Sequence, residues 1–66
     1  MSNKELLDDL KRLKKEGISY KYIATELDIP ITSFYKYTSD MKFPYLIGKQ
    51  VEDYIYSNFY EVLNDE

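Results

Sequence analysis

The chain has 66 residues, enough for one small domain, because two separate cores would each fall below the size at which a chain buries enough surface to fold. Cysteine and histidine are both absent, which excludes disulfides, thiol chemistry, Cys/His zinc sites and the common catalytic triads. Nine basic against twelve acidic residues give a net charge of −3, which taken alone argues against a nucleic-acid partner.

The negative charge is unevenly distributed along the chain. Residues 1–49 hold all nine Lys and Arg side chains against seven Asp and Glu, a balance of +2, whereas residues 50–66 hold five acids and no base, a balance of −5. Any polyanionic partner should therefore meet residues 1–49. No apolar run approaches the roughly 18 residues of a membrane span, and the N-terminus has no signal-peptide core, so we expect a soluble, cytoplasmic protein without membrane contact.

The first helix is predicted over residues 2–16. One of its faces carries four leucines, with charged side chains at most of the other positions: Leu6, Leu7, Leu10 and Leu13. Ser2 and Glu5 have the spacing of a capping box, and Met1 with Leu6 that of a hydrophobic staple. Gly17 can take the left-handed conformation that ends the helix.

Three further helices are expected, over residues 19–27, 31–39 and 45–63. Ser19 is a good cap for the first of these, and Ile29 ends it because the residue before a proline disfavours helical geometry. The last segment carries its main apolar side chains within one arc of a helical wheel: Ile47, Val51, Tyr54, Ile55, Phe59 and Val62. With no alternating strand pattern and no repeat, the sequence predicts an all-α fold, a single four-helix domain over residues 1–66.

The segment 19–37 has apolar spacing typical of two helices that cross at a steep angle. Counted from Ala24, hydrophobic residues fall one position before it and three, five, ten and thirteen positions after it: Ile23, Leu27, Ile29, Phe34 and Tyr37. The small alanine allows a close crossing, and the larger side chains fill the wedge between the helices. The turn must place Asp28 in a left-handed conformation, which aspartate tolerates less well than glycine but better than most residues.

This block resembles the helix-turn-helix of the phage repressor and Cro family, the small XRE-like regulators, over about residues 19–39. It departs from that family in Asp28 for the usual glycine, in Pro30 where a polar side chain usually caps the second helix, and in the single long helix that follows. The resemblance implies a transcription regulator, such as a repressor of phage or mobile-element origin. It would bind double-stranded DNA with the helix 31–39 in the major groove.

The resemblance also implies which side chains touch the DNA. Those expected to reach base edges face away from Phe34 and Tyr37: Ile31, Thr32, Tyr35 and Lys36. Their chemistry suits base reading, because a lysine can donate to guanine, a threonine to either groove edge, and an isoleucine can pack on a thymine methyl. Phosphate contacts are expected from a second set: Tyr20, Lys21, Ser39 and Lys42. Ile31 fits the core as well as it fits a base.

A helical packing core with no ligand would show the same spacing. The composition of the outer face of helix 31–39 argues against that reading, because residues 29–39 contain no acid, whereas a purely solvated face more often carries Glu and Lys. The basic run at Lys11, Arg12, Lys14 and Lys15 is explained adequately as a solvated face near the end of a helix.

Tyrosine is in excess, with eight in the chain. Tyr22 and Tyr37 are expected at the core or its edge. A second stripe on the last helix lies apart from the buried arc: Tyr45, Tyr56, Tyr60 and Leu63. This stripe is typical of a partner surface, which would make the helix 45–63 the dimerisation element of a homodimer. Two alternatives stay open: a protein-interaction module or inhibitor that works through this acidic helix, and tyrosines that only cover a thin core.

No constellation for catalysis is present. The sequence has no nucleophile with a base, no glycine-rich phosphate loop and no cluster of metal ligands, so we expect no enzymatic activity, no metal and no cofactor. The neighbouring carboxylates of Asp8 and Asp9 point roughly 100° apart on a helix and do not converge on one centre.

Overall fold

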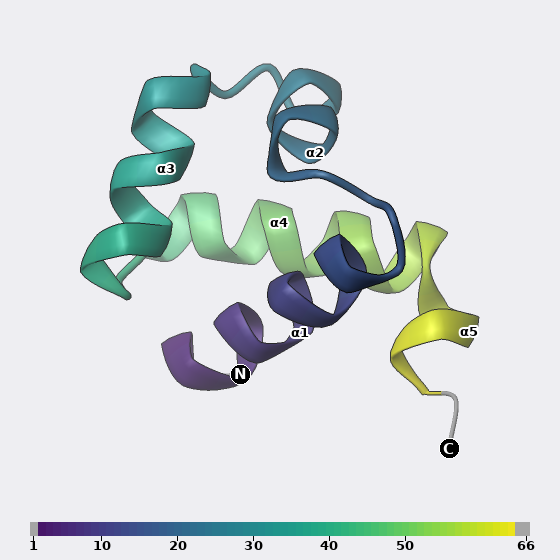
Figure 1. Ribbon diagram of the computed structural model, residues 1–66. Helices are drawn as coiled ribbons and strands as arrows, with labels where there is room; N and C mark the ends of the chain where they lie inside the picture. The colour runs from purple at the N-terminus through teal and green to yellow at the C-terminus, as the bar shows by residue number, and fades with distance from the viewer. Residues whose placement is uncertain (1, 65–66) are drawn as a thin grey trace.

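The computed structural model describes residues 2–64, which form five helices and no strand: α1 (Asn3–Lys15), α2 (Tyr20–Glu26), α3 (Ile31–Asp40), α4 (Tyr45–Asn58) and α5 (Tyr60–Leu63). The all-α fold is as predicted. In Figure 1, α4 runs across the molecule and α1 packs against it, while α2 and α3 form a pair on one side. The short α5 lies at the opposite end of α4 from α3 and packs on α1.

The first helix begins with the predicted capping box. The Glu5 backbone N–H donates to the Ser2 hydroxyl at 3.2 Å, and the Ser2 backbone N–H donates to the Glu5 carboxylate at 3.3 Å. These two hydrogen bonds lower the pKa of Glu5 below its ordinary value. Met1 lies outside the described residues, so its staple with Leu6 stays a prediction.

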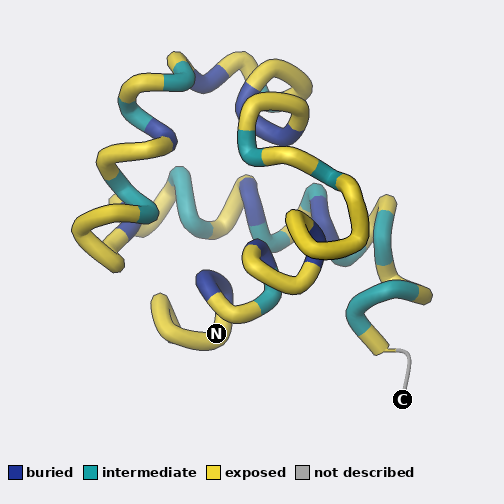
Figure 2. The backbone as a smooth tube through the Cα atoms, viewed as in Figure 1, coloured by how far each residue is buried: buried dark blue, intermediate teal, exposed yellow. Residues whose placement is uncertain are grey.

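One hydrophobic core joins the first four helices. All four leucines of α1 are buried, as their spacing predicts, together with side chains from α2, the turn after it, α3, the loop before α4 and α4 itself (Figure 2). The buried set consists of Leu6, Leu7, Leu10, Leu13, Ile23, Ala24, Ile29, Phe34, Phe43, Val51 and Ile55. No charged or polar side chain among the described residues is buried with them. The fold therefore depends on apolar packing, as expected for a chain this small.

The first three helices are each followed by a residue in the left-handed backbone conformation. Gly17, Asp28 and Met41 each have a positive φ, at 98°, 58° and 59° respectively. In each case the next N–H reaches back five residues to a helix carbonyl, for example from Ile29 to Ala24 at 2.8 Å. The predicted left-handed turns at Gly17 and Asp28 are confirmed. The one at Met41 is unexpected, because a methionine there works against its side-chain sterics.

The predicted single helix over residues 45–63 is wrong, because the structure breaks it at Phe59 and gives five helices in place of four. Phe59 has φ −128° and ψ 29°, outside the helical region. Its ring packs on the edge of Tyr54, with centroids 5.9 Å apart. The Asn58 side-chain amide donates to the Tyr54 carbonyl at 2.8 Å at the end of α4. Beyond the break, α5 turns back onto α1.

Candidate nucleic-acid interface

The helix pair α2 and α3 has the helix-turn-helix arrangement that the spacing predicts. Ile23, Ala24, Ile29 and Phe34 are all buried at the crossing. Pro30 caps α3 without a side-chain hydrogen bond, and Ser19 caps α2 by accepting the Tyr22 N–H at 3.0 Å. Leu27 and Tyr37, the remaining members of the pattern, pack against the same core. The wedge therefore fixes which face of α3 points away from the protein.

That outer face exposes most of the residues expected at base edges. Thr32, Tyr35 and Lys36 are exposed, and Tyr35 keeps half of its surface. Ile31 is half-buried and packs against the core, so of the two roles left open for it the structure shows packing, with the rest of its side chain still accessible. The face presents a hydroxyl, a phenol and an ammonium group side by side, and carries no carboxylate until Asp40 at the end of the helix.

An aromatic ladder connects the outer face of α3 to α1. The ring of Tyr20 lies 5.7 Å from the ring of Phe34 and 6.3 Å from that of Tyr35, centroid to centroid. On the other side, the Lys14 ammonium lies 4.9 Å from the Tyr20 centroid, within cation–π range. Burial raises the pKa of Tyr20 above its ordinary value.

Lys14 is a functional candidate that sequence reasoning missed. The basic run on α1 looked like an ordinary solvated face, since no sequence rule places α1 next to α3. Lys14 contacts Tyr20, and Tyr20 contacts Tyr35, so the Lys14 ammonium group lies at the edge of the α2–α3 surface. A tyrosine at the start of α2, five positions after a lysine-rich helix end, is the only sequence signal that could have suggested it.

The two expected phosphate-contacting lysines lie in the chain on either side of α3, and both are exposed. Lys21 is exposed in the first turn of α2, and Lys42 is exposed in the loop after α3, next to the exposed Ser39 at the end of that helix. The charge of residues 20–42 is balanced, three lysines against Glu26, Asp28 and Asp40. The acids lie at the helix ends and in the turn, and Lys14 adds a positive charge from α1, so positive charge dominates at the start of α2 and the middle of α3.

The stripe predicted on the last helix does not form one partner surface. Of its four members, Tyr45 and Tyr60 are exposed, but Tyr56 and Leu63 pack against the core. The Tyr56 hydroxyl donates to the Asp9 carboxylate at 2.6 Å, a contact that ties α4 to α1. This bond, together with burial, raises the pKa of Tyr56 to about 12. The break at Phe59 changes the helical phase, so spacing across it does not place side chains on one face.

Tyr54 lies where its sequence position predicts, whereas Tyr22 is more exposed than expected. Tyr54 is half-buried beside Phe59, as its place on the buried arc predicts. Burial raises its pKa to about 12, and Tyr22 and Glu26 of α2 add to the shift. Tyr22 was expected at the core or its edge, but half of its surface is exposed, because it lies over α4 at the outside of the bundle.

Neither a metal centre nor a membrane span is found in residues 2–64. No group of three carboxylates lies close enough to hold a cation, and no helix combines the length and apolarity needed to cross a bilayer. Comparison with protein-family models, with curated proteins and with solved structures finds no match to this chain.

Proposed function

We propose that the chain is a sequence-specific, double-stranded DNA-binding regulator of transcription that places α3 in the major groove and acts as a homodimer. The observation that carries this proposal is the outer face of α3. It holds exposed Thr32, Tyr35 and Lys36 on a helix whose opposite side is fixed by the buried Phe34. A rigid helix that presents donors and an ammonium group outward has the geometry needed for reading base edges.

Each exposed side chain has a separate role in this proposal. Lys36 donates to guanine O6 and N7, and Thr32 to a groove edge or a phosphate. Tyr35 offers its ring to a base and its hydroxyl to the backbone, while the contact with Tyr20 limits the positions that ring can take. Ile31, half-buried, has its remaining surface available for a thymine methyl.

Phosphate contacts come from the borders of the same surface. Lys21, Lys42 and Ser39 are exposed around it, and Lys14 reaches it through Tyr20. With about three lysines per copy, the slope of log K against log salt is about −3 for one copy bound to a half-site. Affinity of a single copy is therefore modest, and pairing on two half-sites about 34 Å apart strengthens it.

The experiment is a selection from random duplex DNA at physiological salt, followed by binding to the enriched site. We expect enrichment of a palindrome, a loss of about tenfold or more with Lys36→Glu, and a comparable loss with Tyr35→Ala. Lys4→Glu is the matched charge control, because Lys4 is exposed on α1 and its salt bridge is with Asp8 at 3.3 Å. A selection without enrichment, or binding equally weakened by the control, overturns the proposal.

The alternative role, a protein-interaction module that works through the acidic C-terminal helix, has less support. Two members of its supposed surface, Tyr56 and Leu63, pack against the core. A capture experiment in which Tyr60→Ala abolishes binding to a protein partner, with no DNA enriched in the selection, would favour this role.

A further inference from the structure

The corner between α3 and α4 holds three of the six large hydrophobic side chains that are exposed in residues 2–64. Three large hydrophobic side chains within six residues are mostly exposed: Met41 at 58%, Tyr45 at 81% and Leu46 at 73%. Packing inside the chain does not account for them, since Phe43, between them, is the residue that the core takes. Its ring lies 5.8 Å from that of Phe34 and 5.7 Å from that of Tyr37, centroid to centroid.

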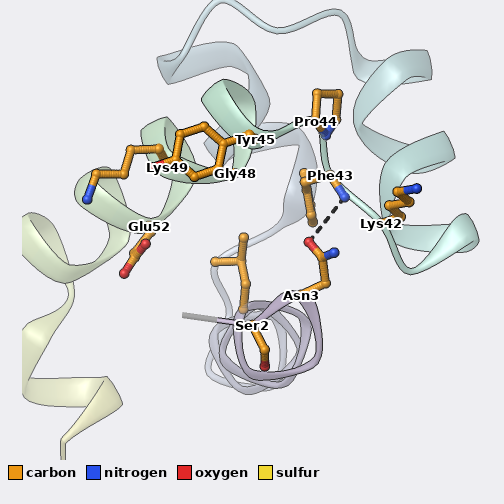
Figure 3. A pocket seen from close by; sticks show the side chains of 10 residues that line it. Ser2, Asn3, Lys42, Phe43, Pro44, Tyr45, Gly48, Lys49 and Glu52 are labelled. Atoms are coloured by element: carbon orange, nitrogen blue, oxygen red, sulfur yellow. Dashed lines mark hydrogen bonds between the residues drawn. The ribbon is translucent and has the colours of Figure 1, made fainter.

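An open groove lies directly beside this corner. It has a volume of about 680 Å³ and runs between the start of α1 and the start of α4 (Figure 3). Leu6, Phe43 and Pro44 form its apolar part and Tyr45 stands at its edge, while polar and charged side chains line the rest: Ser2, Asn3, Lys42, Lys49 and Glu52. The Phe43 backbone N–H donates to the Asn3 side-chain oxygen at 3.3 Å, which fixes the loop that forms one wall. Gly48 keeps the wall close, because a Cβ there would lie 3.3 Å from the Cβ of Phe43.

A two-fold interface can form where an exposed apolar side chain lies next to a groove with an apolar part. In an isologous pair, one surface patch meets itself, so each copy must carry both the inserted side chain and the groove that receives it. Here Leu46 is the inserted side chain, and the neighbouring Tyr45 lines the groove.

The distribution of charge along the chain also favours pairing at the α3–α4 corner over pairing at α5. Residues 40–52 contain Asp40, Lys42, Lys49 and Glu52, a net charge of zero, so two copies meet here without repulsion. Residues 53–66 contain four acids and no base, a net charge of −4, so two copies meeting at α5 would repel each other. Tyr60, the other exposed residue of the original stripe, lies in that acidic part.

We propose that a second copy of this chain covers the α3–α4 corner, with Leu46 of each copy seated in the groove of the other. This names the partner surface within the proposed function, and it is tested without DNA, so that the two can fail separately. A stable pair buries about 800 Å² per copy. That is about a sixth of the 4682 Å² surface.

Sedimentation of the protein alone tests the pairing, over about 1 µM to about 1 mM. We expect wild-type protein to associate with rising concentration, and Leu46→Glu to weaken the association at least about tenfold. Tyr45→Glu is the second variant. Both residues are exposed in the first turn of α4, where a carboxylate favours the helix, so both variants should keep the wild-type circular dichroism.

Tyr60→Glu is the matched control, because it adds the same charge at a residue 61% exposed at the other end of α4. It should associate like wild-type protein. A wild-type chain that stays monomeric over the whole range overturns the proposal. So does association lost in Tyr60→Glu, or retained in both Leu46→Glu and Tyr45→Glu. Binding of a single DNA half-site, measured separately with Lys36→Glu, tests the DNA proposal whichever way the pairing result falls.

Discussion

Two regions of this small protein are rich in tyrosine, and the structure uses them differently. At the C-terminal end, Tyr54 and Tyr56 are half-buried, one against Phe59 and the other hydrogen-bonded to Asp9. On the outer face of α3, half of the Tyr35 surface is exposed to solvent, and its ring contacts that of Tyr20. Tyr54 and Tyr56 therefore contribute to packing inside the fold, whereas Tyr35 presents an aromatic ring that the fold does not need.

The reason for this difference lies in what stands opposite each helix. Near the C-terminal end of α4, Tyr54 packs on Phe59 and Tyr56 donates to Asp9 of α1, so these two tyrosines find partners inside the chain, whereas Tyr60 of α5 stays exposed. The α3 helix packs on α2 through one face, and nothing in residues 2–64 covers the other. Exposed aromatic area that the fold does not use is available to a ligand.

The largest expected effect is on stability, and it separates two adjacent residues of α3. Phe34 is fully buried and Tyr35 is half exposed. Phe34→Ala should lower the free energy of unfolding by about 3–5 kcal/mol, because it removes a large buried ring from a core with little to spare. Urea denaturation followed by circular dichroism measures this, with Tyr35→Ala as the neighbouring control. Equal destabilisation by the two changes would contradict the assignment of their faces.

A smaller effect is expected at the C-terminal region from Tyr56→Phe. Loss of the hydroxyl that donates to Asp9 should lower the free energy of unfolding by about 1 kcal/mol at neutral pH. Urea denaturation at pH 7 measures it. A variant as stable as wild type would show that this tyrosine is not part of the scaffold.

The Tyr56 hydroxyl should also make the free energy of unfolding depend on pH in the alkaline range. The pKa of Tyr56 is raised from 10.0 to about 12 in the folded chain, so folding favours the protonated phenol. Its contribution is complete below about pH 10 and is lost as the pH rises from about 10 to about 12. Stability measured across this window should fall less steeply in Tyr56→Phe than in wild type. Identical slopes would mean that Tyr56 titrates alike in both states.

Effects similar in size to that of Tyr56→Phe, but opposite to each other in sign, are expected at the left-handed helix ends at Met41 and Gly17. Met41→Gly should raise the free energy of unfolding by about 1 kcal/mol, because glycine takes φ 59° without strain and the methionine side chain is mostly exposed. Gly17→Ala should lower it by a similar amount, since only backbone strain changes where a Cβ meets nothing within 4 Å. Thermal unfolding of both variants, shifting in opposite directions, checks the pair.

Local patterns predicted much of this fold. The capping box at Ser2, the left-handed positions at Gly17 and Asp28, and the buried wedge around Ala24 depend on neighbours within a few residues, so spacing alone could identify them. The break at Phe59 could not be predicted in this way. It depends on the Phe59 ring meeting Tyr54 and on α5 packing against α1, contacts that exist only once the chain has folded.

The candidate site shows the same division. Helical spacing identified the exposed Thr32, Tyr35 and Lys36, because Phe34 alone fixes which way α3 faces. It missed Lys14, whose position depends on how α1 crosses the start of α2. It also grouped Tyr45 with Tyr56, although Tyr45 is exposed and the Tyr56 hydroxyl is bonded to Asp9.

The most direct test of the central claim is the binding of duplex DNA, from a selection at physiological salt, by wild-type chain and by Tyr35→Ala, Lys36→Glu and Lys4→Glu. We expect wild-type binding to weaken steeply with salt, the first two variants to lose about tenfold or more with their fold intact, and Lys4→Glu to bind within about twofold of wild type. DNA binding that is indifferent to both α3 changes, or no duplex selected at all, would contradict the assignment of α3 as the recognition helix.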